Sequence, residues 1–129
     1  MPVITIRTNV SFTKGTINRL LLDLSHKAAA ILGKDKNKVL ASYQHCEMTC
    51  NGTNENAAFI DVQSINGAPK NQCSDICLSF YESICRFTSI DPSRIYFNIF
   101  NVEPVSAWKI VEGKAVCPED MKGVGGFSI

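Results

Sequence analysis

The chain has 129 residues, of which 45% are hydrophobic and 19% charged, a composition typical of one globular domain and unlike a disordered or fibrous protein. Thirteen basic and twelve acidic residues leave a formal net charge of +1, which argues against a protein that binds mainly to nucleic-acid phosphates. No apolar run approaches the roughly 20 residues of a membrane span, and residues 1–12 lack the features of a secretory signal. We therefore expect a single domain over 1–129, cytoplasmic, that binds neither nucleic acid nor membrane.

The six cysteines are interpreted as reduced thiols, because small disulfide-stapled domains carry a higher proportion of cysteine. Cys73 and Cys77 fall on the apolar face of a predicted helix, where we expect them to be buried as small hydrophobic side chains. Cys46 and Cys50 have a spacing that a metal site can use, but no second Cys/His pair stands at a recognisable spacing to complete it. Redox sensitivity and metal binding are the alternatives, and we expect no metal.

The hydrophobic pattern predicts four strands and two helices in chain order. Residues 3–8 (VITIRT) are rich in β-branched side chains and predict a strand. Apolar residues then recur at helical spacing from Ile17 to Leu32, between N-cap candidates at 11–13 and Gly33, a residue typical of a helix C-terminus. The later elements are expected as a strand at 39–46, a turn at 47–56, a strand at 57–65, a helix at 72–87, a strand at 94–100, a weakly patterned segment from Glu103, and a loose tail at the GVGG of 123–126.

The order strand–helix–strand, repeated once, predicts an α/β fold. Two βαβ units with right-handed crossovers place both helices on the same face of one four-stranded sheet. The opposite face has no helix to cover it, and alternation gives the fourth strand two unlike sides, namely Ile95, Phe97 and Ile99 against Tyr96, Asn98 and Phe100. A half-apolar sheet face without cover favours an oligomer.

Several short motifs follow one another in a fixed order. They are Met1-Pro2, Thr8-Asn9-Val10, Gly33-Lys34, Ser64-Ile65, Arg94-Ile95-Tyr96 with Asn98 two residues on, and Trp108. In this order and spacing they resemble the macrophage migration inhibitory factor and D-dopachrome tautomerase family. The resemblance implies a homotrimer of βαββαβ subunits with active sites between neighbouring subunits. It also implies secretion without a signal peptide as the alternative to a cytoplasmic location.

The chain departs from the family pattern in three turns and in its last segment. Asp35 replaces the proline that follows the Gly-Lys pair, residues 50–52 (CNG) replace a Phe-Gly-Gly turn, and Asn66 replaces the glycine after Ser64-Ile65. Ala57 and Ile60 stand where some members carry a cysteine pair, so the thiol-redox activity attributed to that pair is not carried over. Residues 109–129 form a longer, divergent C-terminal tail, so we expect the pocket rim and the subunit contact made there to differ.

Pro2 is the candidate catalytic base. Removal of Met1 would leave its secondary amine at the N-terminus, anchored by the strand that begins at Val3. Such an amine is held in a fixed direction for proton abstraction, and it must be unprotonated at neutral pH. A lysine ammonium at ~6 Å, with an effective dielectric constant of ~20, would lower the pKa of the amine by about two, so Lys34 alone would suffice. The plainer alternative is a proline that follows the initiator methionine by chance.

Four further residues are candidates for substrate binding. Lys34 would receive a carboxylate, or else it belongs to a solvated KDKNK loop. Tyr96 and Asn98 lie two apart on a strand and face the same way, so they can hold a carbonyl or enolate oxygen, unless they merely line a sheet interface. Ile65 would offer a backbone amide and an apolar wall, and Trp108 either walls the pocket or packs in the core.

We therefore expect a keto–enol tautomerase that acts on phenylpyruvate-like aromatic α-keto acids and catalyses dopachrome-type isomerisation. Pro2 is its expected base, Lys34, Ile65, Tyr96 and Asn98 are its expected binding residues, and no cofactor is needed. The alternative is a cytokine-like secreted signalling protein with a vestigial pocket and a cell-surface receptor. A third possibility is a structural trimer that binds no ligand.

Overall fold

The computed structural model describes residues 2–120, and each of the six predicted elements is present there, the first strand with the predicted ends and the others with ends shifted by one or a few residues. The strands of the main sheet are β1 (Val3–Thr8), β2 (Leu40–His45), β3 (Ala58–Ile65) and β4 (Ile95–Val102), and the helices are α1 (Lys14–Leu32) and α2 (Lys70–Cys85). Short 3₁₀ helices, η1 (Lys36–Lys38) and η2 (Pro92–Arg94), precede β2 and β4, and a hairpin of β5 (Lys109–Val111) and β6 (Lys114–Val116) follows. Met1 and the GVGG tail lie outside the described residues.

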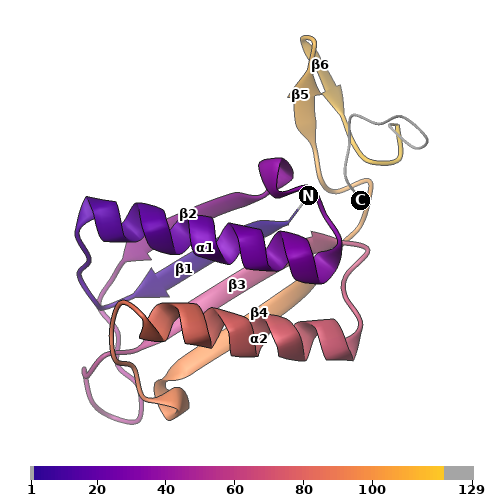
Figure 1. The fold of residues 1–129 in the computed structure, drawn as a ribbon. Coiled ribbons are helices and arrows are strands. Elements are labelled where there is room, and N and C mark those ends of the chain that lie inside the picture. Colours follow the sequence, from indigo (N-terminus) through magenta and orange to yellow (C-terminus); the bar gives the residue numbers. More distant parts are fainter. Residues whose placement is uncertain (1, 121–129) are drawn as a thin grey trace.

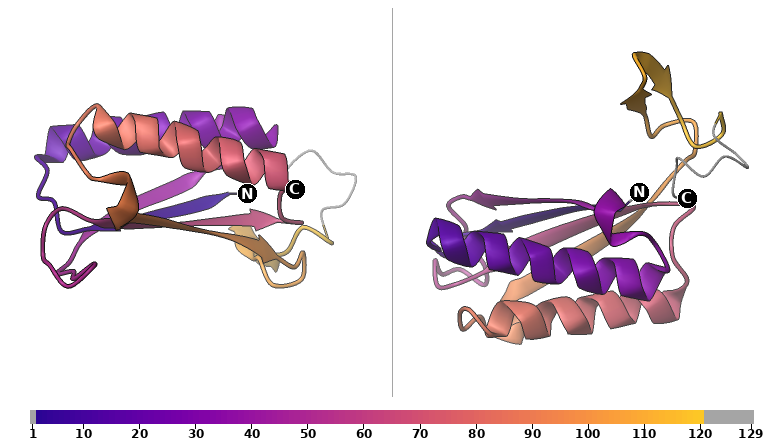
Figure 2. Two further views of the ribbon diagram at one scale, coloured as in Figure 1. Left: turned by 90° about the horizontal axis from the view of Figure 1, so that it is seen from below. Right: turned by 45° about the horizontal axis from the view of Figure 1, so that its top comes forward.

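The sheet has the strand order β2-β1-β3-β4. Strand β1 is parallel to β2, and β3 is parallel to β4, so each pair is joined through its own helix. The two central strands, β1 and β3, run antiparallel. Both helices cover one face of the sheet, as Figures 1 and 2 show, and the other face carries no helix. The predicted α/β fold of two βαβ units, with both helices on one face, is therefore confirmed.

The core lies between the helices and the sheet. Burial alternates along β1 with the period of two that the sequence predicts, because Ile4 and Ile6 face the helices. The fully buried side chains of the core come from both layers and comprise Ile4, Ile6, Leu20, Leu24, Ala28, Ile60, Val62, Ile76, Phe80 and Ile84. Helix α1 begins where expected, since the Thr16 amide donates to Thr13 Oγ1 at 3.2 Å, and it ends at Gly33 in the left-handed conformation.

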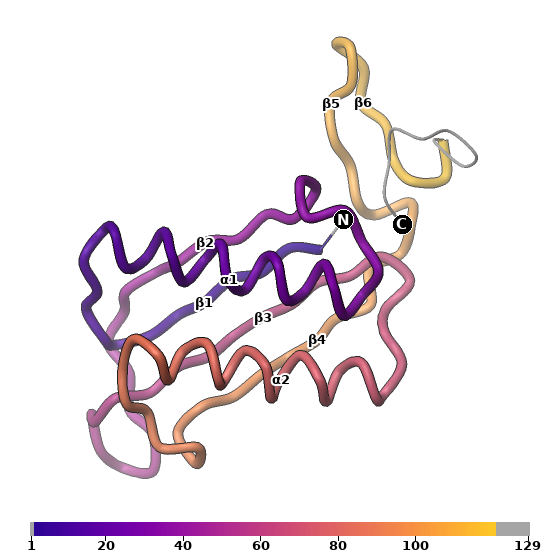
Figure 3. Tube along the Cα trace, viewed as in Figure 1, coloured from indigo at the N-terminus to yellow at the C-terminus, as the bar shows by residue number. Residues whose placement is uncertain are grey.

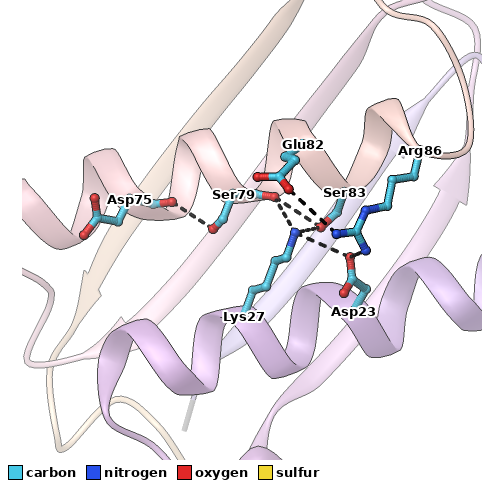
Figure 4. A network of polar contacts seen from close by, with 7 residues as sticks. All are labelled: Asp23, Lys27, Asp75, Ser79, Glu82, Ser83 and Arg86. Atoms are coloured by element: carbon cyan, nitrogen blue, oxygen red, sulfur yellow. Dashed lines mark hydrogen bonds and ion pairs between the residues drawn. The ribbon is translucent and has the colours of Figure 1, made fainter.

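A polar network joins the two helices above this core (Figure 4). The ammonium of Lys27 on α1 donates to Ser83 Oγ at 2.6 Å and to the Ser79 carbonyl at 3.2 Å, both on α2. Asp23 lies 3.6 Å from Lys27 and 3.7 Å from Arg86, so one carboxylate serves cations from both helices. These contacts link α1 to α2.

The predicted burial of two cysteines on α2 needs correction. Cys73 and Cys77 are only half-buried, because they flank the buried stripe of Ile76, Phe80 and Ile84 instead of lying within it. The partial burial is still enough to raise the pKa of the Cys77 thiol. All six cysteines are free thiols.

The β5–β6 hairpin, which the sequence pattern did not predict, projects beyond one end of the sheet (Figures 1 and 3). Its strands have three residues each and are joined through Glu112 and Gly113, both with positive φ (51° and 78°), as in a type I′ turn. The divergent tail at 109–129 thus begins with a hairpin. No helix in the described part of the chain is long and apolar enough to cross a membrane.

Candidate active site

Pro2 lies at the start of β1, and its side chain is fully buried. Its carbonyl accepts a hydrogen bond from the Leu40 amide at 3.1 Å, so the backbone of Pro2 is tied to the edge strand β2. The residue therefore has the fixed direction that a terminal base requires.

Lys34 follows the C-terminus of α1, and its amide donates to the Ala29 carbonyl at 2.9 Å. Its side chain is half-buried, and this desolvation lowers the pKa of the ammonium. The KDKNK segment is an ordered turn, because Asp35 caps η1 by accepting from the Asn37 amide at 2.9 Å. The residue that replaces the family's proline therefore keeps this turn closed in another way.

Ile65 is buried at the end of β3. Because β3 is antiparallel to β1, with Gln63 opposite Val3, Ile65 lies at the end of the sheet where β1 begins. Asn66 follows with φ 65°, a left-handed conformation that asparagine tolerates better than most residues. The substitution of glycine by Asn66 thus leaves the turn after Ile65 intact.

The C-terminal end of α1 also lies at this end of the sheet (Figures 1 and 2). The structure accordingly brings Pro2, Lys34 and Ile65 to one end of the subunit.

Tyr96 and Asn98 lie elsewhere in the same subunit. Both are on the helix-free face of β4, as their spacing predicts, and the Tyr96 side chain is 54% exposed. Tyr96 is opposite Phe59, which is in turn opposite Arg7, so Tyr96 is two strands across and five residues along from Pro2. With about 4.8 Å between strands and about 3.3 Å per residue, their Cα atoms are roughly 19 Å apart. The two ends of the expected site do not meet within one subunit.

Pro2 and Lys34 line none of three pockets that lie over the described residues. The one that contains Tyr96 has a volume of about 550 Å³ and is also walled by Phe59, Met48 and Arg94. Another, of about 600 Å³, lies where β1 and β2 end and is lined by Asn9, His45, Cys46, Glu47, Met48, Thr49 and Asn54.

Arg94 holds the loop beside Tyr96, a role that the sequence did not reveal. Its guanidinium is buried and donates to four backbone carbonyls, those of Cys50 (2.5 Å), Glu55 (2.8 Å), Asn56 (3.0 Å) and Thr53 (3.2 Å). Asn9 completes this clamp from the end of β1, since its Oδ1 accepts from the Ala57 amide at 2.9 Å. The sequence named Arg94 only as part of the Arg94-Ile95-Tyr96 motif at the start of a strand, which does not indicate such a clamp.

Trp108 does not pack in the core of its own subunit. Its side chain is 54% exposed on the segment that leads to β5, and its Nε1 donates to the Val105 carbonyl at 2.8 Å. The core-packing alternative is therefore wrong for the single subunit.

A family model described as macrophage migration inhibitory factor (MIF) matches residues 1–114. The chain belongs to the MIF family. Among solved structures, it is similar to a MIF homologue from Prochlorococcus marinus at 28% identity, covering 88% of this chain and 97% of that one with a TM-score of 0.76. It is also similar to a MIF from Toxoplasma gondii at 24% identity, covering 88% and 99% with a TM-score of 0.79.

A more distant structural neighbour of this MIF-family chain is Pt0534 inactivated by 2-oxo-3-pentynoate, at 14% identity, covering 93% and 98% with a TM-score of 0.78. Comparison with curated protein sequences gives no match. The family match supports an isomerase activity of the tautomerase type.

Proposed function

We propose that this protein is a keto–enol tautomerase of phenylpyruvate-like aromatic α-keto acids, able also to catalyse dopachrome-type isomerisation, with Pro2 as its catalytic base. The observation that carries the proposal is the position of Pro2, buried at the start of β1 at the same end of the sheet as Lys34 and Ile65. Membership of the MIF family supports the reaction class.

In the proposed reaction the Pro2 amine, exposed by removal of Met1, takes the proton from the carbon next to the substrate carbonyl and delivers it to the carbonyl oxygen, so that the ketone becomes the enol. The Lys34 ammonium binds the substrate carboxylate. Burial already disfavours the charged form of Lys34, so an anionic carboxylate beside it offsets part of that cost. Ile65 supplies a backbone amide and an apolar wall, and the proposed reaction uses no cofactor.

Tyr96 and Asn98 take part only if another copy of the chain supplies them, because in one subunit roughly 19 Å separates Tyr96 from Pro2 and, by the same register, roughly 14 Å separates Asn98 from Pro2. We therefore include a homotrimer in the proposal, with the helix-free face turned toward its neighbours. Exposed apolar side chains on and near that face, including Leu40 and Phe100, support such an assembly. Sedimentation should give about three times the chain mass of 14.2 kDa. A stable monomer at micromolar concentration would exclude the shared site.

Covalent labelling with 2-oxo-3-pentynoate tests the base directly. An acetylenic keto acid adds to an unprotonated amine, and this compound inactivates a protein of the same fold. We expect one adduct per chain on the peptide that begins at Pro2, loss of phenylpyruvate tautomerase activity in step with labelling, and protection by phenylpyruvate.

The matched control is protein that retains Met1, in which the Pro2 nitrogen is an amide and should not react. Because the chain has six free thiols, the adduct must be located by peptide mapping. Adducts only on cysteines, with activity retained, would refute Pro2 as the base. Native protein that keeps Met1 would instead favour the cytokine-like alternative, in which the protein leaves the cell without a signal peptide and binds a cell-surface receptor.

A further inference from the structure

An ion pair stands on the helix-free face of the sheet, where the neighbouring positions are mostly uncharged. Arg7 Nη1 on β1 donates to Asp61 Oδ2 on β3 at 2.7 Å, and the two side chains are 40% and 17% exposed. The pair crosses diagonally between the strands, because Arg7 is opposite Phe59 whereas Asp61 is opposite Thr5. Only one of the two carboxylate oxygens is used in this contact.

The other oxygen, Asp61 Oδ1, is buried and accepts no hydrogen bond from any residue in the described part of the chain. A buried charged acceptor without a donor is costly, more so than a buried neutral one. Oδ1 is therefore positioned to accept a hydrogen bond that the isolated subunit does not yet make.

Besides the Thr5 hydroxyl, which faces Asp61 from β1, Asn98 is the candidate donor that strand register places beside Asp61. It lies directly opposite Asp61 on the parallel strand β4, on the same helix-free face, with about 4.8 Å between the two strands. Its side-chain amide makes no hydrogen bond to residues 2–120 and is exposed. An acceptor without a donor and a donor without an acceptor thus stand side by side on neighbouring strands.

We infer that Asp61 is a positioning residue for Asn98, its Oδ1 accepting one Nδ2–H so that the second Nδ2–H points to the substrate oxygen. The inference rests on the proposed function, in which Asn98 holds the carbonyl or enolate oxygen. A side-chain amide can turn its oxygen or its nitrogen toward a ligand, and only the nitrogen donates. An ionised carboxylate accepts only, so Asp61 selects the orientation in which Asn98 donates, while Arg7 holds the carboxylate by its other oxygen.

A double-mutant cycle tests this role. Asp61→Asn keeps the shape of the side chain but removes the strict acceptor, so kcat/KM for phenylpyruvate should fall about tenfold, the scale of one hydrogen bond to a charged group. In the Asn98→Ala background the same substitution should change kcat/KM by less than twofold, because no amide remains to be oriented. Asp75→Asn, the same chemical change on an exposed position of α2, is the control and should have no effect. Equal losses in both backgrounds would overturn the inference.

The amide orientation can also be observed without any turnover, which separates this inference from the proposed function. In ¹⁵N–¹H spectra, the side-chain pair that disappears in Asn98→Ala identifies Asn98. In the wild type, one of its two protons should exchange with solvent more slowly than the other, and Asp61→Asn should abolish the difference.

Two protons that exchange equally in the wild type would refute the inference even if the enzyme is active. If the protein proves inactive but the asymmetry is present, the proposed function fails and the Asp61–Asn98 contact stands. Sedimentation of each variant checks assembly, and Asp61→Ser replaces Asp61→Asn if the latter does not fold.

Discussion

Replacing Arg94 should destabilise the fold far more than replacing an ordinary arginine. Its guanidinium is 6% exposed and donates to four carbonyls at 2.5–3.2 Å. Each charge-assisted bond contributes about 1.5–3 kcal/mol, but three of the four acceptors belong to exposed residues that regain water when the arginine is removed. The uncompensated loss is then about one bond, so Arg94→Ala should lower the free energy of unfolding by about 3 kcal/mol, the upper end of the range for one such bond. Arg94→Lys should lower it by about 2 kcal/mol, because an ammonium lacks the planar fork that reaches several carbonyls.

The assay is urea unfolding at pH 7 and a fixed subunit concentration, since any assembly makes apparent stability depend on concentration. Arg86→Ala is the matched control, because Arg86 is 57% exposed and its ion pairs are 3.7 Å long, and it should cost less than about 1 kcal/mol. Amide exchange should rise in residues 50–57 before the rest of the sheet, since the clamp holds that loop. If the free energy of unfolding of Arg94→Lys lies within about 0.5 kcal/mol of the wild-type value, the four contacts do not stabilise the fold by the expected amount.

Two further predictions concern the turns near Pro2. Burial lowers the pKa of Lys34 in the folded state, so the folded chain binds fewer protons than the unfolded chain between the lowered and the ordinary pKa. This cost to the stability of the folded state is present at neutral pH and is relieved as the pH rises toward 10. Lys34→Gln should therefore hold or raise the melting temperature at pH 7 while lowering kcat/KM for keto acids at least tenfold. A lower melting temperature at pH 7 would contradict the desolvation of Lys34. Asn66 has φ 65°, so Asn66→Ala should cost about 1 kcal/mol in thermal unfolding whereas Asn66→Gly should change stability little; similar losses in both would show that the side chain, and not the backbone, matters.

Local sequence rules predicted the fold because each element carries its own signal. The β-branched run at 3–8, the cap at Thr13 and the left-handed Gly33 all act within a few residues of the feature that they specify. The helix-free face followed from topology alone, since two βαβ units leave one side of a sheet uncovered. The residues of the candidate site were named from the family resemblance, and the structure fixes only where they lie in one subunit.

The features that were missed depend on contacts between distant parts of the chain. Arg94 donates hydrogen bonds to carbonyls 38 to 44 residues earlier in the chain, and the sequence next to Arg94 does not indicate that this loop lies close to it. The β5–β6 strands are three residues long, too short for a periodic pattern to appear. Cys73 and Cys77 were predicted on the apolar face of α2, but they flank its buried stripe and are only half-buried.

Because the two central strands β1 and β3 are antiparallel, the two halves of the subunit are related by an approximate two-fold axis. The order β2-β1-β3-β4 maps onto itself when the β1–α1–β2 half is exchanged with the β3–α2–β4 half, so the start of β3 at Ala58 corresponds to the start of β1 next to Pro2. The chain can begin at only one of these two positions, because at the other it runs on through the loop from β2. A circular permutant opened at residue 57, with a new terminal proline before β3, would move the terminal amine to the opposite end of the sheet, close to the pocket that contains Tyr96. The position at which the polypeptide begins therefore decides which of the two corresponding ends of the sheet carries the terminal amine.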